Sequence, residues 1–297
     1  ARAAANKIHS PGLNVVWANA EGDIGWWAAA KLPQRPEGVN STFVLDASKG
    51  EAVKPGFYSF NYNPQEENPA RGYIVSGNQQ PKPASGVPVP GYYNLPDRAQ
   101  RLDEVLSRPQ IKWNSAAAQE LQLDTSNGYS KRILKDLLPA LEAVVTDPNE
   151  KAFLEPLKKW DGSYTRDSIA ATMFSQLMYE VAKAAFADEL GEAQFKNLLR
   201  TRALENALPL LMADPKSPWW DNVDTPAKEN YFQTAQECEN YVNELTQRML
   251  LSKDWYTLLA PRLINETASD DAWMGNTGQD NGAFRPGAQY VITPENM

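Results

Sequence analysis

The chain has 297 residues, of which 42% are hydrophobic, 10% aromatic and 22% charged, a composition typical of folded globular proteins. Its formal net charge is −8, with 29 Lys and Arg against 37 Asp and Glu, so a nucleic-acid-binding surface would form against the overall field and no nucleic acid partner is expected. No apolar run approaches the roughly 20 residues that span a bilayer, which argues against a membrane partner.

The first 95 or so residues have the pattern of short strands and loops. Two β-rich runs, "NVVWANA" and "DIGWWAAAK", flank Glu21-Gly22 and predict a hairpin. A later run, "STFVLD", predicts another strand, and Tyr73–Val75 predict a buried strand that breaks at Ser76-Gly77. Proline and glycine recur so often here that helices are not expected.

Three amide side chains follow that last strand, at Asn78, Gln79 and Gln80. These side chains either form a solvated turn or point toward a substrate, and the local sequence pattern is compatible with both interpretations.

From about Asp97 the pattern becomes helical. "YSKRILKDLLPALEAVV" carries an apolar stripe, and Pro139 within it suggests a kink or a break. "TRDSIAATMFSQLMYEVAKAAF" predicts a helix buried over a wide face, and a third stripe runs from Tyr231 through Cys238 to Met249. We assign these stripes to the core. The expected organisation is a β-rich region over 1–96, a helical region over 97–268 and a polar tail over 269–297.

The counts of histidine and cysteine exclude several kinds of site. With one histidine, His9, and one cysteine, Cys238, the chain can form neither an internal disulfide nor a Cys/His zinc site. A histidine-dependent triad would need His9, which is better interpreted as a polar surface group. Chemistry in this chain must therefore use amides, carboxylates, arginine or a nucleophile from elsewhere.

Short sequence motifs with known chemistry are few in this chain. Phosphate-loop, dinucleotide-binding, zinc-protease and nucleophile-elbow motifs are missing from the sequence. "DTSNGYSKR" does not have the spacing of a calcium loop, so a helix N-cap at Ser126, Asn127 or Ser130 is the better interpretation.

Five segments in order carry a resemblance to a known family: "NVVWANAEGDIGWWAAAKLPQR", "NPARGYIVSGNQQP", "LPDRAQRLDEVL", "LQLDTSNGYSKRILKDLLPAL" and "KKWDG". Together they resemble the β-subunit of the penicillin acylase family of N-terminal nucleophile hydrolases. The resemblance implies an α+β fold: part of the αββα sheet layers, with a large helical insertion. The tail departs most, because the Trp-Gly and later His of the family are not found there.

The resemblance also implies an activity and site residues. The activity is hydrolysis of a linear amide, releasing an acyl group from an amine such as a β-lactam nucleus or a homoserine lactone. The family's nucleophile is an N-terminal serine activated by its own α-amino group, which needs no histidine. Asn78 matches the oxyanion-hole asparagine, Arg98 an arginine near it and the substrate, and Leu13 an apolar residue of the acyl pocket. Gln79 and Gln80 are then left as solvated turn.

Each of the two last assignments has a structural alternative. Arg98 could be a surface charge on the first turn of a helix over Arg98–Leu106, and Leu13 could be plain strand core.

The beginning of the chain departs from the family pattern. It starts "ARAAANKIHSPGLN" rather than with serine, so we expect an internal piece of a β-subunit that is inactive alone. Its expected partners are the remaining β-subunit segment bearing the serine, an α-subunit and a small-molecule acyl amide, and its expected location is periplasmic or secreted. No cofactor is expected, because Gly86 stands where the family's calcium ligand would be an aspartate.

Two other classes of function stay open. The aromatic-rich N-terminal half could be a non-catalytic platform for glycans or peptides. A purely structural domain would be favoured if backbone groups fully satisfied the Asn78 side chain away from any cleft.

Overall fold

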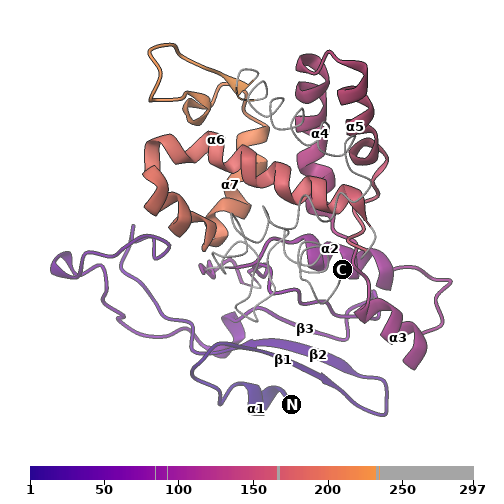
Figure 1. Ribbon diagram of the computed structural model, residues 1–297. Helices are drawn as coiled ribbons and strands as arrows, with labels where there is room; N and C mark the ends of the chain where they lie inside the picture. Colours follow the sequence, from indigo (N-terminus) through magenta and orange to yellow (C-terminus); the bar gives the residue numbers. More distant parts are fainter. Residues whose placement is uncertain (84, 92, 166–167, 232–233, 235–297) are drawn as a thin grey trace. The chain divides into compact units, whose positions relative to one another are not determined.

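A computed structural model describes residues 1–83, 85–91, 93–165, 168–231 and 234 (Figure 1). The chain divides into two compact units, Ala1–Leu121 and Gln122–Met297. The helical pattern begins at Asp97 as expected, whereas the units divide further along the chain.

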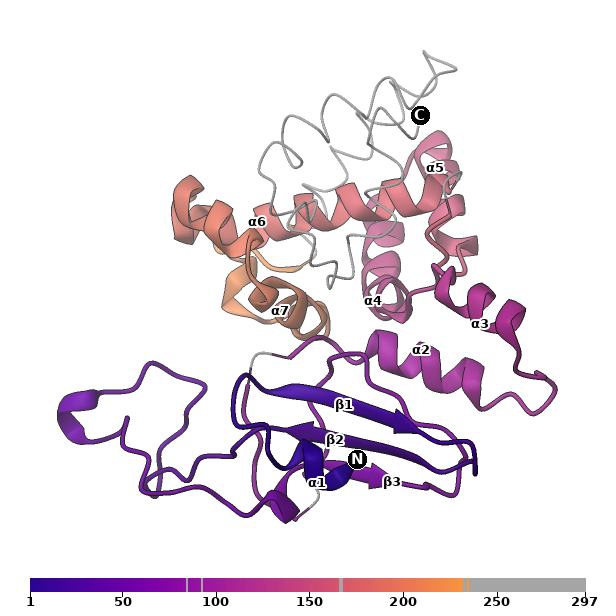
Figure 2. The same ribbon diagram turned by 90° about the horizontal axis from the view of Figure 1, so that it is seen from below.

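The first unit is built on a small antiparallel sheet, seen from below in Figure 2. Its strands are β1 (Leu13–Ala18), β2 (Ile24–Ala29) and β3 (Gln65–Glu67), in the order β1-β2-β3. Val15 pairs with Trp27, and the Asn19 side chain donates to Asp23 across the connecting turn. The predicted hairpin is confirmed.

The core of this unit is small. Trp27 is 2% exposed, and its Nε1 donates to Glu67 Oε1 at 2.9 Å. Trp27 belongs to a buried cluster with Ala29 and Phe60. The short helix α1 (Arg2–Ala5) joins this cluster through Ala5. Because β2 alternates between buried and half-buried residues whereas β1 is mostly exposed, one strand supplies most of the apolar contacts.

Two predicted strands are wrong. In "STFVLD", the Asn40 side chain accepts from Thr42 and the Asp46 side chain from Ser48, leading into the 3₁₀ helix η1 (Ala47–Lys49). Such local bonds between side chain and backbone compete with sheet formation. Tyr73–Val75 are half-buried and lie outside the sheet. A second 3₁₀ helix, η2 (Phe60–Tyr62), leads into β3.

Helices α2 (Asp97–Leu106) and α3 (Ser115–Gln122) close the first unit. The hydroxyl of Tyr73 donates to Asp103 on α2 at 2.8 Å. Helix α2 is therefore joined to the loops that follow the sheet, which explains why the first unit extends past residue 96.

The second unit is helical (Figure 1). Its elements are α4 (Gly128–Val144), α5 (Pro148–Lys159), α6 (Ile169–Leu199), α7 (Arg202–Met212) and the 3₁₀ helix η3 (Pro218–Trp220). Helix α4 packs against α5 and α7, and α6 packs against α5, α7 and η3.

The apolar stripes predicted for α4 and α6 form the core of this unit. The least exposed side chains on the two helices include Ile133, Leu137, Leu141, Met173, Phe174, Leu177, Met178 and Val181. Pro139 neither breaks nor ends α4, and it is exposed. Tyr231 is buried as expected, while the rest of its stripe, from Cys238 to Met249, lies outside the described residues, as does the predicted tail.

Strands and helices are thus segregated along the chain, which is the α+β class that was expected. Within the described part of the chain, no helix is long and apolar enough to cross a membrane.

Candidate active site

Asn78 lies in a tight turn with an unusual backbone conformation. Its φ is 62°, in the left-handed region that asparagine tolerates better than most residues other than glycine. The residue is exposed, although Gly77 before it is buried. A left-handed residue other than glycine persists when its surroundings hold it there.

Two hydrogen bonds hold this turn. The backbone N–H of Asn94 donates to the Asn78 carbonyl at 3.0 Å, and the backbone N–H of Gly77 donates to Gln79 Oε1 at 2.7 Å. Gln79 is half-buried and forms a β-bridge with Asn94. The expectation that Gln79 is solvated turn is therefore wrong, because its side chain closes the turn; Gln80 is exposed as expected.

The turn also packs closely on helix α2. A Cβ atom added at Gly77 would lie 2.9 Å from the backbone nitrogen of Ala99 and 3.3 Å from its Cα. Only a residue without a side chain permits this approach. The close contact places the turn beside the first residues of α2, where Arg98 lies.

Arg98 sets the orientation of the Asn78 amide. Its Nη1 donates to Asn78 Oδ1 at 3.4 Å. A guanidinium can only donate, so the amide atom facing it must be the oxygen. The donor group, Nδ2, is then on the other side of the amide, and no hydrogen bond to it forms within the described residues.

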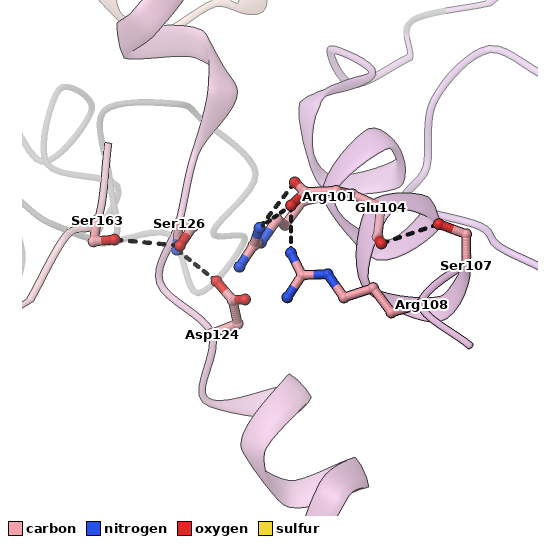
Figure 3. Close-up of polar contacts among 7 residues, drawn as sticks. All are labelled: Arg101, Glu104, Ser107, Arg108, Asp124, Ser126 and Ser163. Carbon is pink, nitrogen blue, oxygen red and sulfur yellow. Dashed lines mark hydrogen bonds and ion pairs between the residues drawn. The ribbon is translucent and has the colours of Figure 1, made fainter. Parts of the chain in front are cut away.

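Two other arginines, Arg101 on α2 and Arg108 just after it, are engaged differently. Arg101 donates to both carboxylate oxygens of Glu104 at 2.8 Å, and Arg108 donates to the same carboxylate (Figure 3). These bonds hold the pKa of Glu104 below its ordinary value. Arg98 differs from these two because it donates to the Asn78 side chain.

The structure therefore brings Asn78 and Arg98 together. Leu13 is at the start of β1 with 48% of its surface exposed, so it is not strand core. His9 is exposed, which agrees with a surface group. The side chain of Asn78 bonds to Arg98 rather than to backbone, so the condition for a purely structural role is not met.

Sequence reasoning missed Gln79 and Asn94. The role of Gln79 in the turn had one local indication in the sequence: its side-chain amide comes two residues after a glycine, close enough to accept that glycine's N–H. Asn94 is 5% exposed, and its pairing with the turn joins positions 16 residues apart, which no local pattern indicates.

Two of the sequence segments that carried the family resemblance have a structural role in the second unit. The Asp124 carboxylate accepts from the Ser126 N–H at 2.7 Å, and the hydroxyls of Ser126 and Ser163 lie 3.3 Å apart (Figure 3). The backbone of Asn127 bonds to Gly162. The Asn127 side chain caps α4, confirming one of the three N-cap candidates.

Carboxylates do not form a metal site in the described residues, since no group of three His, Cys, Asp or Glu converges there. The strongest perturbation is at Glu189 on α6, whose pKa is raised to about 7, first by burial and then by the neighbouring Asp188. This carboxyl lies in the second unit.

Comparisons with known proteins agree on one family. The penicillin amidase family profile matches residues 1–283. The acyl-homoserine lactone acylase QuiP of Pseudomonas syringae pv. tomato is 26% identical over 242 residues, covering 75% of this chain and 29% of the relative. The protein of the same name from Pseudomonas aeruginosa is 25% identical over 244 residues, covering 76% and 28%.

A solved structure shows the same fold. The thermostable penicillin G acylase from Alcaligenes faecalis matches with a TM-score of 0.59 at 20% identity. The match covers 91% of this chain and 49% of that one. The chain thus spans less than a third of the curated relatives' length and about half of the solved chain.

Proposed function

The chain belongs to the penicillin amidase family, and from this membership we propose that it supplies the oxyanion-stabilising part of an amide hydrolase. The substrate class is a linear acyl amide, either a β-lactam with an acylated amine or an acyl-homoserine lactone. The observation that carries the proposal is the exposed Asn78 amide, whose oxygen faces Arg98.

Asn78 would act when the nucleophile attacks the substrate carbonyl. The carbonyl oxygen then gains negative charge, and a rigidly held N–H donor stabilises it more than the ground state. The turn around Asn78 is fixed before the substrate arrives by one backbone bond and one bond from backbone to the Gln79 side chain, so little reorganisation is required at the moment of reaction.

Arg98 and Leu13 have supporting roles in this proposal. Arg98 occupies the amide oxygen of Asn78 and so directs Nδ2 toward the substrate. Leu13, half exposed at the start of β1, would contribute an apolar contact to the acyl group.

The rest of the reaction requires parts of the protein beyond this chain. We propose that a serine at the N-terminus of the mature β-subunit attacks the amide, with its α-amino group accepting the proton. A further β-subunit segment and an α-subunit would complete the αββα layers, the chain alone would be inactive, and the assembled enzyme would be periplasmic or secreted. Recovery of hydrolysis by the 297-residue chain alone would contradict this division of labour.

The proposal is tested by changing Asn78 in the complete protein. Asn78→Gly removes the amide while keeping a residue that accepts φ 62° without strain. Asn78→Asp keeps the shape but replaces the donor with an acceptor. Both should lower kcat for a chromogenic acyl amide by about 100- to 1000-fold, the typical cost of losing one oxyanion donor.

The matched control is the exposed neighbour Gln80. Its side chain donates to the Val89 carbonyl at 3.4 Å and is otherwise unengaged within the described part of the chain, so Gln80→Ala should keep kcat within about twofold. Asn78→Gly and Asn78→Asp variants with unchanged kcat would overturn the proposal.

Exposed aromatic side chains support one second candidate, a binding platform. Trp17 is 37%, Phe57 50% and Tyr62 41% exposed, and the rings of Tyr58 and Tyr62 lie 5.5 Å apart. Glycan binding that is lost in Trp17→Ala, in a complete protein that does not hydrolyse acyl amides, would favour this candidate over the hydrolase.

A further inference from the structure

We propose that Gln79 is a positioning residue for Asn78. The Gln79 side chain closes the turn by bonding to backbone within it. The inference rests on the proposed role of Asn78 as the oxyanion donor. Gln79 Oε1 accepts the Gly77 N–H at 2.7 Å, the shorter of the two bonds that hold the turn.

The backbone geometry explains why such a bond is needed. Asn78 has a φ of 62°, in the left-handed region, which costs most residues other than glycine roughly 1–2 kcal/mol and costs asparagine less. A turn that is strained in this way relaxes unless neighbouring bonds fix it. Gln79 supplies one such bond on the residue before Asn78, while Asn94 supplies the other on the Asn78 carbonyl.

The placement of Gln79 suits this role. Gln79 is half-buried, lies two residues after the buried Gly77 and forms a β-bridge with Asn94. Gln80, in contrast, is exposed. Its Oε1 is directed at backbone within the turn, so Gln79 acts through Asn78 and is not itself a catalytic residue.

The decisive substitution removes the acceptor with little change in size. In the complete protein, Gln79→Met should lower kcat at least tenfold while KM stays within about twofold, because small misplacements of a catalytic group cost up to about 100-fold. Gln80→Met is the matched control and should keep the wild-type kcat. A Gln79→Met variant with wild-type kcat would overturn the inference.

A second measurement does not depend on activity. Hydrogen exchange with residue resolution should show the Gly77 amide exchanging at least several-fold faster in Gln79→Met than in the wild type. Gln79→Glu should restore the protection, because a carboxylate oxygen also accepts. Unchanged exchange in Gln79→Met, or no recovery in Gln79→Glu, would show that Gln79 does not hold the turn.

These results separate the two proposals. If Asn78→Gly is fully active but Gln79→Met speeds Gly77 exchange, the oxyanion role of Asn78 fails while Gln79 still closes the turn. If Asn78→Gly is inactive but Gln79→Met is not, the oxyanion role holds and the positioning role of Gln79 is refuted.

Discussion

Gly77 lies against Ala99 so closely that a Cβ atom on the glycine would be 2.9 Å from the backbone nitrogen of Ala99. The contact joins the turn that carries Asn78 to the helix that carries Arg98. The distance between these two side chains therefore depends on a residue with no side chain of its own.

Gly77→Ala should consequently disturb both stability and the site. The new methyl group meets backbone rather than a flexible side chain, so we expect a loss of about 1–3 kcal/mol in the free energy of unfolding, measured by urea denaturation of the chain. Gly12→Ala is the control, because among the described residues its Cβ would meet Ala30 Cβ alone, at an ordinary 3.8 Å. Equal stability of the two variants would show that the turn and α2 are not in close contact.

Arg98 should affect the rate through Asn78. Arg98→Met removes the donor that orients the amide, and we expect kcat to fall by about tenfold, less than for loss of Asn78 itself. Arg98→Lys keeps a donor and should recover part of the rate. The control is Arg108→Met, which breaks an exposed ion pair with Glu104 and should leave kcat unchanged. If Arg98→Met kept full activity, the orienting role would be refuted.

Alanine substitutions at two glycines of the second unit distinguish the cost of backbone strain from the cost of a steric clash. Gly162 and Gly191 both have positive φ, 83° and 69°, so alanine is strained at both, by roughly 1–2 kcal/mol. A Cβ at Gly162 would also lie 2.6 Å from the Asn127 carbonyl oxygen, whereas at Gly191 no atom of the described residues would lie within 4 Å of it.

Gly162→Ala should therefore cost about 1–3 kcal/mol more than Gly191→Ala in chemical denaturation. The difference measures the contact between the loop before α6 and the N-cap of α4. Similar losses at the two positions would mean that these loops are not held together.

Much of this arrangement could be predicted from the sequence because it is local. The hairpin follows from two β-rich runs around a Gly turn, and the α4 and α6 cores follow from their apolar spacing. Asn78 and Arg98 could be named from a family resemblance. Their contact could not, since it depends on the approach of Gly77 to Ala99, 22 positions away.

The wrong strand predictions have a related cause. "STFVLD" has β-type composition, but Val44 is 100% and Phe43 72% exposed, so no sheet surface stabilises a strand there. Asn40 and Asp46 instead bond to nearby backbone. Strand propensity reflects packing against neighbours, which a single segment does not reveal.

Glu189 should make stability depend on pH. Burial and then Asp188 raise its pKa from 4.5 to about 7, with a smaller contribution from Asp221. Between these values the folded state retains a proton that the unfolded state has released, so stability should fall as pH rises from about 4.5 to about 7. The carboxyl is partly desolvated, but the residue as a whole is exposed and solvent screens its charge, so we expect an effect on the order of 1 kcal/mol or less.

Urea midpoints measured across this range test that expectation. Glu189→Gln should flatten the pH dependence and be more stable than the wild type at pH 8. Glu192→Gln, which breaks an exposed pair with Lys196 beyond the kink at Gly191, should keep the wild-type slope. An unchanged slope in Glu189→Gln would show that this carboxyl does not titrate as described.

The most direct test of the central claim is a crystal structure of the complete protein with a phosphonate or boronate adduct on its nucleophile. The anionic oxygen of the adduct occupies the position of the oxyanion. We predict that Nδ2 of Asn78 lies about 2.7–3.1 Å from it, with Oδ1 still facing Arg98. An adduct oxygen that bonds to other donors, with Nδ2 of Asn78 directed into solvent, would contradict the account.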